Sequence, residues 1–164
     1  MDVKETIRTR RSIRKFKEKD IPDEVIEEIL DAGRWAPSGL NNQPWKFMVI
    51  KDQEKKDRIT DFTHYSHIVK GAKILIAVFL DNEVVYNRTK DVQAIGACIQ
   101  NLLLLIHSLG LGACWLGEIL NKHTDVENFL EVSGNLELMA VIVLGYPGEK
   151  PGKGNRRELK ELLL

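Results

Sequence analysis

The sequence contains little cysteine. Cys98 and Cys114 are its only two cysteines, they are not spaced as a CxxC pair, and no secretory leader precedes them. A disulfide framework is therefore not expected, because such frameworks need several cysteines and an oxidising compartment. We interpret both residues as small buried apolar side chains and expect a cytoplasmic protein.

The chain also lacks an excess of charge of either sign and a long apolar run. Its 24 lysine and arginine residues balance 24 aspartate and glutamate residues, which argues against a protein that coats nucleic acid. The most apolar stretch, residues 94–111, is interrupted by Gln100, Asn101, His107 and Ser108 and is too broken to cross a bilayer. We expect neither a nucleic-acid partner nor a membrane partner.

Several catalytic motifs are absent. No GxGxxG follows a predicted strand, and neither GxxxxGK[ST] nor GxSxG occurs, so the common nucleotide cradles and the hydrolase nucleophile turn are missing. His64 and His67 lie near Asp61 without the HExxH spacing, and we interpret them as ordinary histidines rather than metal ligands. His107 is expected to be a hydrogen-bonded core or interface residue.

What is present predicts a single α+β domain spanning residues 1–164. A composition of 43% hydrophobic and 29% charged residues is typical of a folded domain. Continuous apolar runs predict strands that are covered on both faces, at residues 45–51, 73–80 and 137–145. Helical periodicity and the capping pairs Asp2/Glu5 and Thr124/Glu127 predict helices at residues 2–9, 22–36, 52–62, 91–109, around 124–127 and at 156–164.

Residues 8–16, RTRRSIRKF, place five cations in a nine-residue stretch. Arginine pairs bidentately with phosphate oxygens, so Arg10 suits a phosphate, while Ser12 and Arg14 could reach a second acceptor on the same ligand. A second basic site, Lys153 with Arg156 and Arg157, could converge on that phosphate. Alone, each cluster would more often be a solvated surface.

A polar loop precedes the first predicted strand. Ser38, Asn41, Asn42 and Gln43 offer hydroxyl and amide groups that could line the edge of a polar heterocycle beside Trp45. The simpler interpretation is a turn followed by a strand that buries a tryptophan. The sequence pattern alone leaves both interpretations open.

Four ordered blocks carry a family resemblance. RRSIRKF, APSGLNNQPWKFMVI, IGACIQNLLLLIHSLGLGACWLG, and VIVLGYP followed by Arg156 resemble the nitroreductase family of FMN-dependent oxidoreductases. The resemblance covers nearly the whole chain and is weakest at residues 52–72 and 82–90. It implies an α+β fold with a central mixed, mainly antiparallel β-sheet flanked by helices. It further implies an intertwined homodimer with C-terminal arm exchange and FMN at the subunit interface.

The resemblance also implies roles for individual residues. Arg10, Ser12 and Arg14 would contact FMN from one subunit, Arg11 would contribute mainly backbone, and Arg156 would join Arg10 at the phosphate. The partner chain would supply the polar loop, and backbone near the reactive edge of the ring would come from the end of a strand. These further residues are Pro37, Ser38, Gly39, Asn41, Gln43, Leu116 and Gly117, with Lys153 as an additional phosphate contact.

The implied reaction is a ping-pong transfer in which NAD(P)H reduces the flavin at N5 and an electron acceptor then takes its place. No protein group is expected to be catalytic, and no metal is required. Nitroaromatics, quinones and flavins are the acceptors implied by the family, with flavin fragmentation or reductive dehalogenation as variants. Two alternatives are a flavin sensor or store without fast turnover, and a phosphate-binding or nucleic-acid-binding module. The short connection at residues 82–90 suggests an open flavin site.

Overall fold

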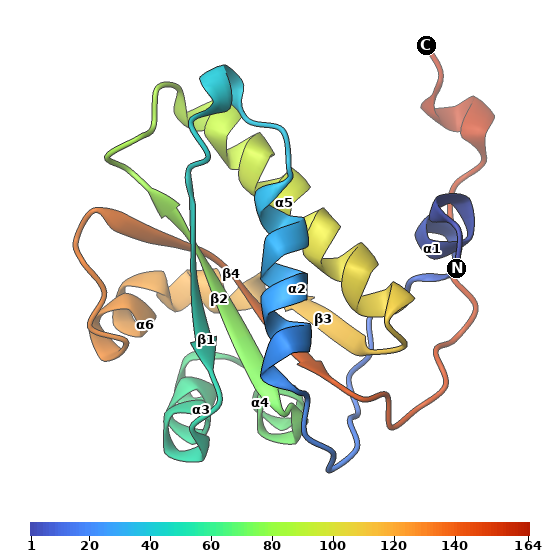
Figure 1. Cartoon of the computed structure of the whole chain (residues 1–164), viewed down its shortest axis with the longest axis horizontal. Helices are drawn as coiled ribbons and strands as arrows, with labels where there is room; N and C mark the ends of the chain where they lie inside the picture. Colours follow the sequence, from blue (N-terminus) through green and yellow to red (C-terminus); the bar gives the residue numbers. More distant parts are fainter.

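A four-stranded antiparallel β-sheet separates two layers of helices (Figure 1). The computed structural model describes residues 1–164. The strands, in their order across the sheet, are β1 (Trp45–Ile50), β2 (Ile74–Asp81), β4 (Leu136–Gly145) and β3 (Gly112–Leu116). All neighbouring pairs are antiparallel, so the expected mixed character is not found among the strands of one chain. The only parallel pairing is an isolated bridge between Ser12 and Ala113.

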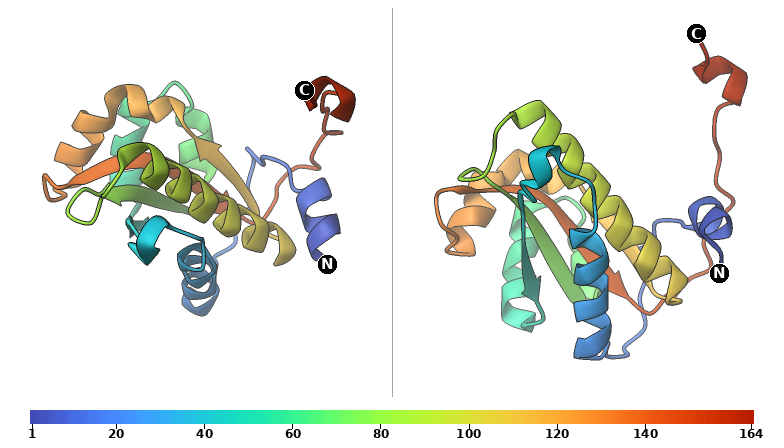
Figure 2. Two further views of the ribbon diagram at one scale, coloured as in Figure 1. Left: turned by 90° about the horizontal axis from the view of Figure 1, so that it is seen from above. Right: turned by 45° about the horizontal axis from the view of Figure 1, so that its top comes forward.

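The two faces of the sheet are covered by different helices (Figure 2). The first face packs on α2 (Asp23–Arg34) and α5 (Arg88–Ser108), and the second packs on α3 (Gln53–Ile59), α4 (Ser66–Gly71) and α6 (His123–Phe129). All residues of β2 are buried, with alternate side chains in the two cores. This arrangement confirms the prediction of strands covered on both faces.

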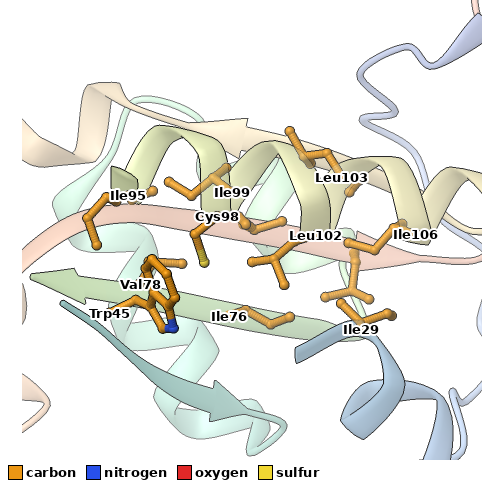
Figure 3. Packing of buried hydrophobic residues seen from close by; sticks show 14 of the residues in the cluster. Ile29, Trp45, Ile76, Val78, Ile95, Cys98, Ile99, Leu102, Leu103 and Ile106 are labelled. Atoms are coloured by element: carbon orange, nitrogen blue, oxygen red, sulfur yellow. The ribbon is translucent and has the colours of Figure 1, made fainter. Parts of the chain in front are cut away.

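Helix α5 forms the largest part of the first core. Figure 3 shows Cys98 and Leu102 pointing from α5 toward Trp45 and Ile76 on the sheet. Cys98 is fully buried, and burial raises the pKa of its thiol to about 12, so this cysteine is an inert apolar side chain as expected. The helix ends before Gly110, whose φ of 75° suits a glycine stop signal.

Local capping signals gave one correct and one wrong prediction. Asp2 caps α1 (Val3–Thr9) by accepting a 2.8 Å hydrogen bond from the backbone N–H of Glu5. The helix predicted from the second pair exists as α6, but it begins at His123 and Thr124 does not cap it. The Glu127 carboxylate instead accepts a 2.7 Å hydrogen bond from the Leu138 N–H, which ties α6 to β4.

The ends of the chain lie outside the sandwich. In Figure 1 the last residues extend away from the body beside α1, which carries the N-terminus. Residues 150–164 are all exposed, and the predicted terminal helix is only a short 3-10 turn, Leu159–Leu162. None of the helices has both the length and the apolar character needed to cross a membrane.

Candidate functional site

The basic segment after α1 is fixed by backbone pairing beside β3 and β4. The N–H of Ile13 donates to the carbonyl of Ala113 at 2.9 Å, and Phe16 forms a bridge with Pro147. The Ile13 side chain is buried in the body of the protein. The positions of the arginines before and after Ile13 are therefore set by the sheet rather than by a free loop.

Gly112 permits this close approach. A Cβ atom at Gly112 would lie 2.8 Å from three side-chain carbons of Ile13, which is closer than carbon atoms pack. Because the Ile13 side chain is β-branched and buried, it has little freedom to move aside. A side chain at this position would push the basic segment away from β3.

We predict that Gly112→Ala lowers the free energy of unfolding by about 1–3 kcal/mol, as overpacking substitutions do. The matched control is Gly71→Ala, because nothing lies within 4 Å of a Cβ atom at Gly71. Urea unfolding of both variants checks the prediction. Equal stability of Gly112→Ala and the unchanged protein would show that the basic segment can shift at no cost.

The arginine side chains of this region form no salt bridges, although the Glu149 carboxylate accepts a 2.8 Å hydrogen bond from the backbone N–H of Arg14. Burial, followed by the charges of Arg156 and Arg11, lowers the pKa of Arg10, so cations from both ends of the chain lie near one another. None of Arg10, Arg11, Arg14 and Arg156 forms a salt bridge. Arg10 and Arg156 therefore lie close enough for their charges to interact.

Arg11 has a different environment from its neighbours. Its Nη1 donates to the carbonyls of Arg8 at 2.7 Å and Arg10 at 2.8 Å, and its guanidinium lies against Gly154. Its Nε is buried without a hydrogen-bond partner. Cations that repel one another and have no salt-bridge partner are the feature that an anion with several oxygen acceptors would satisfy, so the group fits a phosphate dianion.

A cavity of about 210 Å³ opens near Arg14, at the end of β3. Its walls include three predicted site residues, Arg14, Leu116 and Gly117. The other lining residues, which were not predicted as site residues, are Tyr65, Ile68, Cys114, Trp115 and Glu118. This cavity combines one cation and one carboxylate with apolar and aromatic walls, as a planar organic ligand requires.

Two titratable groups of this cavity have shifted pKa values. Burial raises the pKa of the Cys114 thiol, although Arg14, the Ser12 side chain and Arg10 partly offset this effect. The hydrogen bond from Thr63, at 2.7 Å, lowers the pKa of Glu118. At neutral pH the cavity thus holds a neutral thiol and an ionised carboxylate. Cys114 is buried, as expected.

The polar loop forms a second group of predicted residues. The Ser38 hydroxyl accepts a 3.0 Å hydrogen bond from the Gln43 N–H, and the Gln43 side chain donates to the Asn41 carbonyl. Gly39 is needed for space, since a Cβ atom there would lie 2.0 Å from the Tyr86 hydroxyl. Pro37, Ser38 and Gly39 line a pocket of about 260 Å³ with residues of α5. Those residues are Lys90, Gln93, Ala94 and Ala97.

The two groups lie along different parts of α5. Arg10 and Arg11 pack near Ile106 and His107, whereas the polar loop packs near Gln93. Thirteen residues from Gln93 to Ile106 correspond to roughly 20 Å at 1.5 Å per residue. No hydrogen bond or cavity joins the groups, so one chain does not bring them together. Lys153 is exposed.

His107 links α5 to the basic segment. Its Nε2 lies 2.8 Å from the Thr9 hydroxyl, so the expectation of a hydrogen-bonded histidine is confirmed. Burial, then the charges of Arg10 and Arg11, lower its pKa. The histidine is therefore neutral at pH 7.

We predict that His107 reduces stability under mildly acidic conditions. As the pH falls below about 6.5, the unfolded histidine takes up a proton while the folded one does not, so the free energy of unfolding falls until the lower folded pKa is reached. His107→Gln should show a smaller loss between pH 7 and 5. His67→Gln, at an exposed position, is the control. Identical pH profiles for His107→Gln and the unchanged protein would contradict the prediction.

Comparison with known proteins places this architecture in a family. The nitroreductase family pattern matches residues 7–72 and 62–146. A Methanothermobacter thermautotrophicus protein, provisionally named NADH dehydrogenase/NAD(P)H nitroreductase, is 38% identical over 154 residues, covering 93% of this chain and 81% of the relative.

Solved structures agree with this match. A crystal structure of a provisionally named nitroreductase from Desulfovibrio desulfuricans, in complex with FMN, has a TM-score of 0.95 and 49% identity, covering 99% of this chain and 95% of the other. The NADPH:FMN oxidoreductase of Vibrio harveyi, complexed with NAD+, has a TM-score of 0.89 and 26% identity, covering 98% of this chain and 75% of the other. The chain belongs to the nitroreductase family.

Proposed function

We propose that the protein is an FMN-dependent oxidoreductase that uses NADH or NADPH to reduce a small organic acceptor. The observation that carries the proposal is the uncompensated group of Arg10 and Arg156 near a cavity lined by Arg14, Leu116 and Gly117. The family membership and the FMN complex of the Desulfovibrio desulfuricans relative support the same ligand. The whole chain, residues 1–164, is proposed as one FMN-binding unit.

Different residues would contact different parts of FMN. Arg10 and Arg156 would hold the phosphate, and Arg11 would contribute mainly backbone. Ser12 and Arg14 contact the ring end, where the positive charge of Arg14 offsets negative charge that the ring acquires. Leu116 and Gly117 contribute backbone beside its reactive edge. Bound FMN supplies the hydride chemistry at N5, so no protein nucleophile or metal is required.

The second part of the site would come from a partner subunit in a homodimer. Pro37, Ser38, Gly39, Asn41 and Gln43 lie too far along α5 to reach the arginines of their own chain. A second copy of the chain supplies this loop to complete the pocket.

Exposed apolar surface supports the dimer. Trp35 is 73% exposed, and a groove of about 360 Å³ runs between α1, α2 and α5. Leu159, Leu162 and Leu163 on the terminal segment are also exposed. Surfaces of this kind, which cost free energy in water, are typical of protein interfaces. We propose that the C-terminal segments exchange between subunits and cover part of this surface.

The proposed acceptor is a nitroaromatic, a quinone, a flavin or a similar planar compound. The connection between β2 and α5 consists of residues 82–87 and is too short to hold a covering helix of its own. An open approach to the ring would admit several acceptors. Flavin fragmentation and reductive dehalogenation would need further groups above the ring.

The test is anaerobic reduction of the purified protein. We expect a yellow protein that binds one FMN per chain, bleaches with NADH or NADPH, and regains its colour with nitroaromatic or quinone acceptors. A yellow protein that does not bleach would favour a sensor or store. A colourless protein that does not bind added FMN would overturn the proposal, and salt-sensitive DNA binding would then favour a nucleic-acid module.

A further inference from the structure

Asp91 is a fully buried carboxylate in the first turn of α5. One oxygen accepts a 2.7 Å hydrogen bond from Asn42 Nδ2, and the other accepts from the backbone N–H groups of Tyr86 at 3.1 Å and Asn87 at 3.0 Å. Burial alone would raise the pKa of Asp91, but the hydrogen bonds from Asn87, Asn42 and Tyr86 outweigh it and lower the pKa. The carboxylate is therefore charged at neutral pH.

The loop that contacts Asp91 has an unfavourable backbone conformation. Leu40, Asn41 and Gln43 have φ values of 56°, 56° and 48°, in the left-handed region that L-residues with side chains rarely adopt. Each such residue costs of order 1–3 kcal/mol unless its surroundings hold it, with asparagine at the low end. A free loop of this sequence would relax toward other conformations.

Asn42 is the side chain that holds this loop against α5. Its amide nitrogen donates both to Asp91 and, at 3.0 Å, to the Val84 carbonyl. Its Oδ1 is buried without a partner. The Asn42 side chain therefore leaves its oxygen without a hydrogen bond, while its nitrogen donates to Asp91 on α5 and to Val84 just before α5. Reversing the amide would set its oxygen against the carboxylate, so Asp91 fixes the orientation.

We infer that Asp91, acting through Asn42, is a positioning residue that holds residues 38–43 in the conformation that presents Ser38 and Asn41 to the flavin site of the neighbouring subunit. The inference rests on the proposed function, since it assigns the loop to that site. The inference also gives the short connection between β2 and α5 a role, which is to hold residues 38–43 in place. Residues 84–87 supply the Val84 carbonyl, the Tyr86 ring against Gly39, and two backbone donors for Asp91.

The first test measures FMN affinity in Asp91→Asn. Asparagine has the same shape but lacks the charge and the second acceptor oxygen, so one of the three donors loses its partner. We expect FMN binding to the FMN-free protein to weaken tenfold or more. Asp125→Asn is the matched control, because Asp125 also lies in the first turn of a helix but is exposed. Its FMN affinity should remain within twofold of the unchanged protein.

A second variant covers the case in which Asp91→Asn does not fold. Asn42→Ala leaves Asp91 with its two backbone donors and removes only the link to the loop. The Asn42→Ala protein should fold, as judged by circular dichroism, and should bind FMN tenfold or more weakly, as expected for Asp91→Asn. Unchanged FMN affinity in Asn42→Ala, or in folded Asp91→Asn, would overturn the inference.

Mixed dimers separate positioning from a general loss of structure. A dimer of one Asp91→Asn chain and one Arg10→Ala chain should keep one site with the affinity of the unchanged protein. The displaced loop and the missing arginine both belong to the second site, so the first site carries neither defect. Two weakened sites would contradict positioning across subunits. If the unchanged protein itself binds no FMN, the proposed function fails instead, so the two failures are distinguishable.

Discussion

Arg10→Ala is expected to weaken FMN binding by about 100-fold or more while the FMN-free protein stays at least as stable. A charge-assisted hydrogen bond contributes about 1.5–3 kcal/mol, so losing two of them at the phosphate corresponds to at least 100-fold at 1.4 kcal/mol per tenfold. In the absence of ligand, Arg10 is partly desolvated and faces the positive charges of Arg156 and Arg11. Removing it relieves this repulsion.

The prediction is specific because FMN affinity should fall while the stability of the FMN-free protein should stay the same or rise. FMN titration and thermal unfolding of the FMN-free protein are measured on Arg10→Ala and on a control, Arg58→Ala. Arg58 is an exposed arginine on α3 that pairs with Asp61 on the second face of the sheet. The control should change neither quantity much, since exposed ion pairs contribute about 0–1 kcal/mol. Unchanged FMN affinity in Arg10→Ala would refute its assignment to the phosphate.

The sequence predicted elements whose signals lie within the element itself. The Asp2 cap, the periodicity of α2, the long apolar stretch of α5 that ends at Gly110, and the apolar runs of β1, β2 and β4 are local patterns, and each element lies close to its predicted position. Strand β3 was missed because it has only five residues, of which the first is Gly112, and because its pairing with β4 is a long-range contact. Helix α4, with six residues, was missed for the same reason of length.

In the candidate site, too, features with a local sequence signal were predicted and features that depend on long-range contacts were not. The basic segment could be predicted because its arginines lie within seven residues of one another in the sequence, whereas Arg156, which lies near Arg10, comes from the other end of the chain. The contact between Asn42 and Asp91 was not visible, because 49 positions separate them and each residue type has common local roles. The wrong capping pair at Glu127 has this cause too, since its partner Leu138 belongs to a later strand.

The length of α5 limits how the arginines and the polar loop could contribute to one FMN site. Its two ends hold the two groups of predicted residues about 20 Å apart, and the sheet beneath it is fully packed. Bringing the groups together within one chain would require the core to open. Association of two chains would meet the same need without disturbing either core, although it costs translational and rotational freedom and the ordering of the exposed ends.

A dimer that combines one Arg10→Ala chain with one Asn41→Gly chain is therefore expected to bind a single FMN with unchanged affinity. In the proposed homodimer each chain would supply its arginine to one site and its loop to the other, so both defects would fall in one site and the second site would be intact. Glycine is chosen at Asn41 because it removes the amide while tolerating the φ of 56°.

The measurement uses two affinity tags to isolate the mixed dimer and titrates it with FMN beside both homodimers. The homodimers should bind no FMN at concentrations that fill the unchanged site, whereas the mixed dimer should bind half as much FMN per chain as the unchanged protein. If each chain instead contributed both groups to its own pocket, both sites of the mixed dimer would be weak. A protein that remains monomeric while binding FMN tightly would also exclude the shared site.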